Sequence, residues 1–158
     1  MKILLFCLFF ITINAFSQTE IKEKVKDTVE IFRTTEVDTK PQLSKGMYTL
    51  SLFISKNFNF DENIKNKKII IFSSFVIEPD GKMTDIKAFH ISFKDYIESN
   101  VENASTADDK IAQLDQIESM KGETVRVLNL FNKTWTAAKK GGKEVRCLYN
   151  YPINFTIE

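Results

Sequence analysis

Few side chains in this sequence are suited to catalysis. His90 is the only histidine, and no serine or cysteine can be placed beside it from the sequence. A lone histidine in a strand is more commonly a half-exposed surface residue than a general base. Carboxylates occur in "TADD" and "LDQIES", but they do not have the spacing of metal ligands. We therefore expect no enzymatic activity, no cofactor and no metal site.

Basic side chains gather around a pair of glycines near the C-terminus. Lys139, Lys140 and Lys143 flank Gly141-Gly142. Such a cluster could hold an anion, but a basic hairpin turn is the commoner meaning of the pattern, because glycines accept the positive φ that tight turns require. We predict a turn here.

The first 17 residues have the pattern of a secretory signal peptide. Lys2 precedes an apolar run from Ile3 to Ile13, and Ala15 and Ser17 place small residues before Gln18. A membrane-spanning helix needs about 20 apolar residues, and this run is shorter. We therefore predict cleavage before Gln18 and a periplasmic or secreted protein. An uncleaved membrane anchor is the alternative.

The composition after that cleavage site limits the classes of partner. Lys2 is the only charge in the first 17 residues, which leaves 21 basic and 21 acidic side chains. This balance predicts neither a nucleic-acid partner nor a polybasic membrane patch. Cleavage also removes Cys7 and leaves Cys147 as the only cysteine, which excludes an intramolecular disulfide. Cys147 lies on the apolar side of a strand, so we interpret it as a small core residue rather than a reactive thiol.

The elements that would position a site begin after a polar stretch. Residues 18–43 are charge-mixed and poor in apolar side chains, which predicts a flexible lead-in, and the folded domain is expected to span 44–158. Apolar residues recur at spacings of three and four from Met47 to Phe58 and predict a first helix, with Ser44 as its N-cap.

A hairpin and two further helical patterns follow. Lys68 to Phe93 contains two β-branched and aromatic runs that flank Pro79-Asp80-Gly81, which predicts a β-hairpin. Between Asp95 and Gly122 the chain is polar, and we expect an insertion there. Apolar residues at every third position indicate either a short amphipathic helix or a mobile segment: Ile111, Leu114, Ile117 and Met120. Glu123 to Phe131 predicts another helix.

The C-terminal segment has the most regular strand pattern of the chain. Apolar and polar residues alternate from Glu144 to Ile157, and Leu148 is the only apolar residue on the polar side. Pro152 has no backbone N–H and favours an edge strand. We therefore predict that this strand lies at an edge of the sheet, where it can accept another chain.

The order of these patterns resembles the C-terminal domain of TonB. "FVIEPDGKMTDIKAF" is followed by a helix, Trp135, a "KGGKEVR" turn and "YNYPINF", and the resemblance covers residues 37 to 158. Lys133-Thr134 stand where the family has proline and lysine before the tryptophan. The resemblance implies an α+β fold in which a small three-stranded antiparallel sheet, of strand order 2-1-3, carries helices on one face.

TonB-type domains accept an extended peptide from an outer-membrane receptor as a further strand. The resemblance therefore implies a periplasmic protein-binding module. The sequence gives no evidence of a small-molecule substrate and does not define the oligomeric state. Partner-binding residues are expected on the exposed face of the last strand: Arg146, Leu148, Asn150 and Asn154. Core residues are expected to be Trp135, Tyr149 and Phe155. The alternatives are a self-associating structural envelope protein and a TonB energy transducer that keeps its N-terminal helix.

Overall fold

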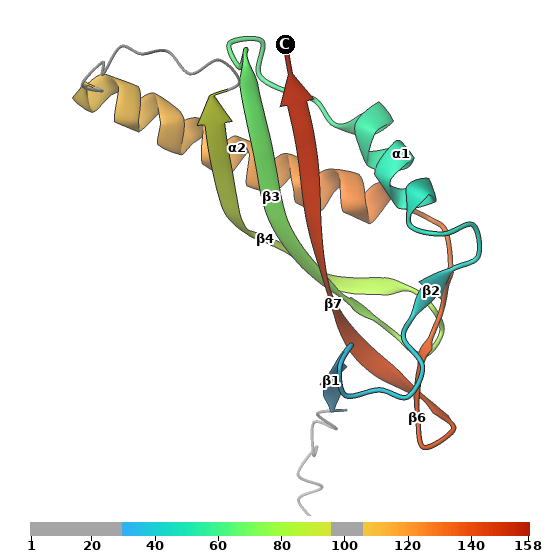
Figure 1. The fold of residues 1–158 in the computed structure, drawn as a ribbon. Helices are drawn as coiled ribbons and strands as arrows, with labels where there is room; N and C mark the ends of the chain where they lie inside the picture. The colour runs from blue at the N-terminus through green and yellow to red at the C-terminus, as the bar shows by residue number, and fades with distance from the viewer. Residues whose placement is uncertain (1–29, 96–105) are drawn as a thin grey trace, which may run out of the picture.

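The computed structural model describes residues 30–95 and 106–158, and the predicted signal peptide with its cleavage site lies outside these ranges. The long strands β3, β4 and β7 run side by side, and α2 lies along one face of their sheet (Figure 1). In chain order the elements are β1 (Ile31–Arg33), β2 (Gln42–Leu43), α1 (Tyr48–Asn57), β3 (Lys67–Ile77), β4 (Met83–Asp95), α2 (Ala107–Leu130), β5 (Trp135–Thr136), β6 (Ala138–Lys140) and β7 (Lys143–Ile157).

The main sheet of the described chain is mixed, curled and five-stranded. Its strand order is β1-β7-β3-β4, with β6 also paired to β7. β1 runs parallel to β7, whereas the other pairs are antiparallel. β2 and β5 form a separate two-stranded sheet. The prediction of a small three-stranded antiparallel sheet of order 2-1-3 is therefore wrong, because β1 and β6 extend the sheet beyond its three long strands.

The segment assigned to a flexible lead-in supplies two of these strands. Between β1 and β2, the backbone N–H of Asp38 donates to the carbonyl of Lys139 at 2.8 Å, and the Asp38 carboxylate accepts the N–H of Gly141 at 2.7 Å. The ammonium of Lys140 lies 3.9 Å from the ring centroid of Phe32 in β1. Leu43 in β2 is buried in the core. The folded unit thus begins before residue 44.

The predicted hairpin is confirmed by the antiparallel pairing of β3 with β4. Gly81 has φ +79° in the turn, and the Asp80 carboxylate accepts the N–H of Lys82 at 3.1 Å. The register shifts twice along this pair, between Phe72 and Ser73 and again between Ser74 and Val76. These irregularities bend β4 and increase its local twist.

β7 pairs with β3 in one continuous register from Cys147 to Ile157. The predicted alternation is confirmed in the second half of the strand, where the two sets of side chains differ in burial, whereas Arg146 and Leu148 in the first half are half-buried. Buried or half-buried residues face the core: Cys147, Tyr149, Tyr151, Ile153, Phe155 and Ile157. The intervening positions in the second half of the strand are exposed: Asn150, Pro152, Asn154 and Thr156.

The first helix is present, but its predicted N-cap is not. Met47 occupies the cap position of α1 without a side-chain hydrogen bond, so Ser44 does not serve as the cap. Leu50 and Ile54 form the buried side of the helix, with Phe58 just beyond its end.

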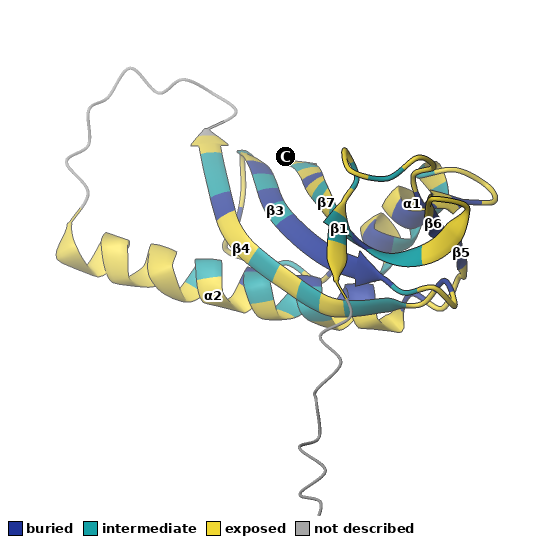
Figure 2. Cartoon of the chain, turned by 90° about the horizontal axis from the view of Figure 1, so that it is seen from below, coloured by how far each residue is buried: buried dark blue, intermediate teal, exposed yellow. Residues whose placement is uncertain are grey.

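The two helical patterns between residues 107 and 131 form one helix, α2. It begins at a capping box in which Thr106 Oγ1 accepts the N–H of Asp109, and the Asp109 carboxylate accepts the N–H of Thr106. Gly122 lies within the helix and does not end it. The part of α2 nearer its N-terminus is largely exposed and extends past the sheet, whereas the remainder packs against it (Figure 2).

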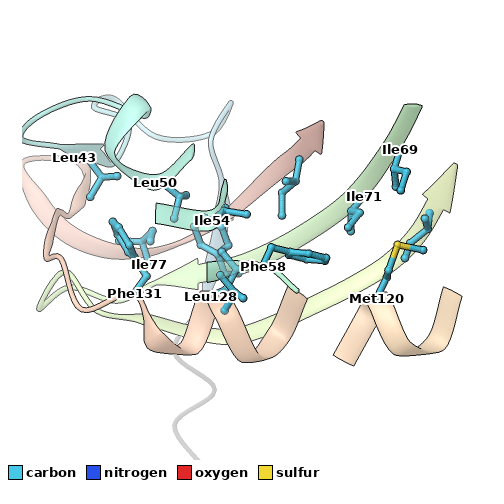
Figure 3. Close-up of a cluster of buried hydrophobic side chains, with 14 of the residues drawn as sticks. Leu43, Leu50, Ile54, Phe58, Ile69, Ile71, Ile77, Met120, Leu128 and Phe131 are labelled. Carbon is cyan, nitrogen blue, oxygen red and sulfur yellow. The ribbon is translucent and has the colours of Figure 1, made fainter. Parts of the chain in front are cut away.

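The core lies between the two helices and one face of the sheet (Figure 3). Ile69, Ile71, Phe75 and Ile77 project from β3 into this layer, where they meet residues of both helices. The helices contribute Leu50, Ile54, Met120, Val127 and Leu128, and Phe131 follows at the end of α2. Neither described helix is long and apolar enough to cross a membrane.

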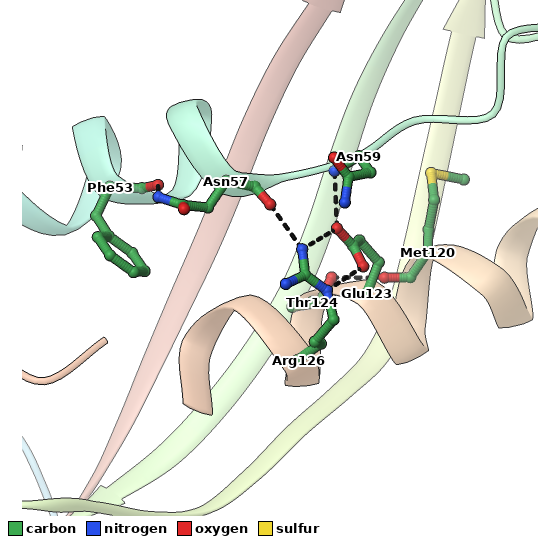
Figure 4. Close-up of polar contacts among 7 residues, drawn as sticks. All are labelled: Phe53, Asn57, Asn59, Met120, Glu123, Thr124 and Arg126. Carbon is green, nitrogen blue, oxygen red and sulfur yellow. Dashed lines mark hydrogen bonds and ion pairs between the residues drawn. The ribbon is translucent and has the colours of Figure 1, made fainter. Parts of the chain in front are cut away.

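A polar contact fixes the end of α1 to α2 (Figure 4). The guanidinium of Arg126 binds the Glu123 carboxylate at 2.6 Å and also donates to the carbonyl of Asn57 at 2.7 Å. Glu123 in turn accepts the N–H of Asn59 at 2.7 Å. These hydrogen bonds lower the pKa of Glu123, chiefly through Arg126. They hold α1 at a fixed position beside β7.

Candidate functional site

The outer edge of β7 is divided into a covered part and an open part. β6 pairs with residues 143–145, and β1 pairs with Arg146, Cys147 and Leu148. From Tyr149 to Ile157, β3 is the only pairing partner of β7 within residues 30–95 and 106–158. The open part therefore presents strand backbone on one side.

The orientation of that backbone follows from one hydrogen bond. Ser73 in β3 donates its hydroxyl to the carbonyl of Tyr151 at 2.7 Å, so the Tyr151 carbonyl faces β3. The N–H and C=O of a strand residue point to the same side, and successive residues point to opposite sides. The outward-facing positions are thus Asn150, Pro152, Asn154 and Thr156. Pro152 fits this assignment, because its missing N–H is on the side without a ladder.

A groove of about 370 Å³ follows the open part of β7. The strand lines one wall with residues 151–156, and α1 lines the other with Ser51, Ile54 and Ser55. The two serine hydroxyls can each donate and accept a hydrogen bond. Sequence analysis did not identify these residues; the only signal is the spacing of four between Ser51 and Ser55 on α1.

The structure divides the four predicted partner-binding residues into two pairs. Arg146 and Leu148 lie in the covered part, opposite Ile31 and Arg33 of β1. Asn150 and Asn154 lie in the open part and are exposed. Of this second pair, Asn154 lines the groove and Asn150 lies just before it, so the candidate site is shorter than the predicted edge.

The Arg146 side chain already has a partner. Its Nε and Nη2 donate to the two carboxylate oxygens of Glu78 at 2.8 and 2.7 Å, and Asp85 lies 3.7 Å away. Glu78 also accepts the hydroxyl hydrogen of Thr84. The hydrogen bonds from Arg146 lower the pKa of Glu78 below its ordinary value. This ion pair joins the residue after β3 to β7, so the Arg146 guanidinium already has a partner within the domain.

The three residues expected in the core are buried or half-buried, and they belong to two aromatic clusters. Trp135 is 3% exposed, and its ring centroid lies 5.3 Å from that of Tyr149 and 5.7 Å from that of Phe75. Tyr149 stacks on Phe75 at 5.6 Å. Phe155 is half-buried and contacts Phe58 at 4.8 Å. Tyr149 and Phe155 thus pack against the core on the inner face of the open part of β7.

The other edge strand of the sheet, β4, is less regular than β7. β4 carries both register shifts, has exposed Lys87 and Lys94 on its edge, and includes Asp85 at φ +49°. Irregular pairing and edge lysines are devices that oppose the addition of another strand. β7 has neither a register shift nor a lysine after residue 143. Of the two edges, β7 is the one suited to pairing.

The residues considered for catalysis do not converge in the described chain. His90 is exposed on β4, with its ring 5.5 Å from Phe72. Cys147 is fully buried, and this burial raises its pKa. Within residues 30–95 and 106–158 no group of three or more His, Cys, Asp or Glu could hold a metal. The lysine-flanked Gly141-Gly142 forms the predicted turn, between β6 and β7.

Comparison with known proteins yields no match to a family model, to a curated protein or to a solved structure. The functional assignment therefore rests on the geometry of β7 and α1.

Proposed function

We propose that this protein is a binding module that accepts an extended peptide as a further strand on β7, between Asn150 and Thr156. The observation that carries this proposal is the open part of β7 with its groove. This part of the strand is regular and pairs on one side only within the described chain. A groove of about 370 Å³ separates it from α1. A peptide added to a sheet edge gains affinity from main-chain hydrogen bonds and selectivity from alternate side chains.

The backbone groups available to such a peptide are defined by the orientation of β7. Outward donors are the N–H groups of Asn150, Asn154 and Thr156. Outward acceptors are the carbonyls of these residues and of Pro152. A bound strand thus meets a ladder with one missing donor, opposite Pro152, and its end is limited by β1, which turns away from β7 after Arg33.

The walls of the groove set the side-chain chemistry of the peptide. Residues that point toward α1 meet the hydroxyls of Ser51 and Ser55, which favour small or polar side chains. Residues that point away lie beside the amides of Asn150 and Asn154. This docking mode is the one that the resemblance to TonB domains implies. The proposed source of the peptide is therefore a periplasmic segment of an outer-membrane receptor.

Two variants of one residue separate backbone from side-chain recognition. Asn154→Pro removes an outward N–H and leaves the inward pairing with β3, whereas Asn154→Ala keeps the N–H and removes only the amide. With a peptide selected against the full chain from a displayed library, we expect Asn154→Pro to weaken binding about tenfold or more and Asn154→Ala to weaken it less. Melting temperatures of both variants monitor the fold.

A scan of the peptide gives a readout that does not depend on the stability of the variants. N-methylation removes one peptide N–H at a time, so strand addition predicts loss of binding at every second position. Equal loss at all positions, or none, would contradict strand addition. Sedimentation of the free chain tests the alternative, since pairing of β7 with its own copy would give a concentration-dependent dimer that Asn154→Pro dissociates.

A further inference from the structure

A second groove lies on the other side of α1, away from β7. Its volume is about 430 Å³, and Tyr48, Leu52, Phe53 and Phe131 supply its apolar surface. Tyr48, Leu52 and Lys56 are spaced by four residues and share one side of the helix, whereas Ser51 and Ser55 line the groove beside β7. The two grooves are therefore separate sites.

The apolar surface of this groove has a recessed floor and a raised rim. Phe131 is buried and its ring meets Phe53 edge-on, with centroids 5.3 Å apart. Tyr48 is 72% exposed and Leu52 is 37% exposed. Large apolar side chains at the mouth of a concavity indicate a site that gains from being covered.

Three cationic side chains surround this apolar surface. Lys45, Lys56 and Lys133 line the groove, and none of its lining residues is acidic. In the described part of the chain, none of these three lysines forms an ion pair. The whole sequence has a net charge of only +1, so these three lysines give the groove a local excess of positive charge. An occupant that complements it has an apolar body and a negative head group.

We propose that this groove binds a free anionic amphiphile, a molecule with one short aliphatic chain and one anionic head group. The chain lies over Leu52 and Phe131, and the head group lies among the lysines. The volume is within the range of small-molecule sites, and three lysines gather around one apolar surface, which suits a single chain with one charged head group. Sequence analysis gave no sign of this site, because its lysines are spread from residue 45 to residue 133.

Four probes separate the contributions of chain and charge. Decanoate below its micelle concentration is expected to bind the full chain with one-to-one stoichiometry in calorimetry. Decanol lacks the charge and butyrate lacks the chain, so both are expected to bind at least tenfold more weakly. Decyl phosphate has the same chain with another anionic head group, so it is expected to bind as well, and failure of both anionic probes would overturn the proposal. Binding of decanoate should weaken as salt is added, because exposed charges are screened.

Variants locate the binding to this groove. The double change Lys56→Gln and Lys133→Gln is expected to weaken decanoate binding about threefold to tenfold, since each exposed charge contact contributes modestly. Lys87→Gln on β4 removes an exposed lysine elsewhere and should have no effect. Leu52→Gln alters the partly exposed rim and is expected to weaken both decanoate and decyl phosphate, while circular dichroism confirms that α1 is retained.

Equal binding of decanoate and decanol, or unchanged binding in the double lysine variant, would overturn the proposal. Binding to anionic vesicles with no binding of decanoate would also overturn it, in favour of a membrane surface. Asn154→Pro should leave decanoate binding intact, so failure at one groove is distinguishable from failure at the other.

Discussion

Gly81 and Trp135 meet through their backbones: the N–H of Trp135 donates to the carbonyl of Gly81 at 2.9 Å. A Cβ on Gly81 would clash with the Trp135 carbonyl oxygen. This contact joins the turn of the β3–β4 hairpin to β5, where Trp135 also pairs with Leu43 of β2. The only tryptophan in the chain is therefore fixed by its backbone as well as by its ring.

Gly81→Ala should destabilise the protein through two effects. The left-handed backbone costs roughly 1–2 kcal/mol for a residue with a Cβ, and the clash with Trp135 adds to it. Gly142→Ala is a matched control, because Gly142 has φ +77° with no atom within 4 Å of the added Cβ. Urea unfolding should show a clearly larger loss for Gly81→Ala. Equal losses would mean that the contact with Trp135 relaxes without cost.

Trp135→Ala should cost about 3 to 5 kcal/mol of unfolding free energy, the range for truncating a large buried aromatic side chain. Trp135→Phe should cost less. The buried Nε1 of Trp135 has no hydrogen-bond partner within the described residues, so phenylalanine loses no hydrogen bond and removes a buried polar group. Thermal unfolding of the two variants checks this order. A phenylalanine variant as unstable as the alanine variant would contradict it.

Glu78 should make the unfolding free energy decrease at low pH. Its folded pKa is lowered below the ordinary value of 4.5 by hydrogen bonds from Arg146, so its contribution is complete above that value. The contribution is lost as the pH falls through the folded pKa, because protonation breaks the ion pair. At pH 7, Glu78→Gln should reduce the unfolding free energy by about 1 to 2 kcal/mol.

The pH dependence distinguishes this pair from a general charge effect. The difference in unfolding free energy between the original chain and Glu78→Gln should be constant from pH 7 to 5 and should shrink at lower pH. Glu62→Gln, in the exposed loop before β3, is the control. A Glu78→Gln variant with the same acid profile as the original chain would show that the ion pair with Arg146 does not stabilise the fold.

The correct predictions from sequence concern elements whose signals are local. The hairpin follows from two strand-forming runs around Pro79-Asp80-Gly81, and the two faces of the second half of β7 follow from the alternation of apolar and polar residues. Both signals lie within a few neighbouring residues. The hydrophobic spacing from Met47 to Phe58 likewise predicts α1, although its N-cap differs.

The errors concern features that depend on distant residues. β1 is three residues long, and its pairing with β7 is stabilised by contacts such as Phe32 with Lys140, which no local pattern reveals. α2 continues through Gly122 because residues on both sides pack against the sheet, which outweighs the weak helix propensity of glycine. The edge of β7 was predicted, but its covered part and the wall supplied by α1 required the three-dimensional arrangement.

The parallel contact of β1 with β7 also has a consequence for how the chain acquires its structure. Ile31 pairs with Arg146, and the central strand β3 pairs with β7 along most of its length, so the sheet depends on contacts between segments far apart in the chain. Such contacts require closure of long loops and slow the folding reaction. During synthesis, the apolar residues of β3 remain without one neighbouring strand until β7 has emerged from the ribosome. Completion of the sheet is thus a late event, reached only after β7 has been made.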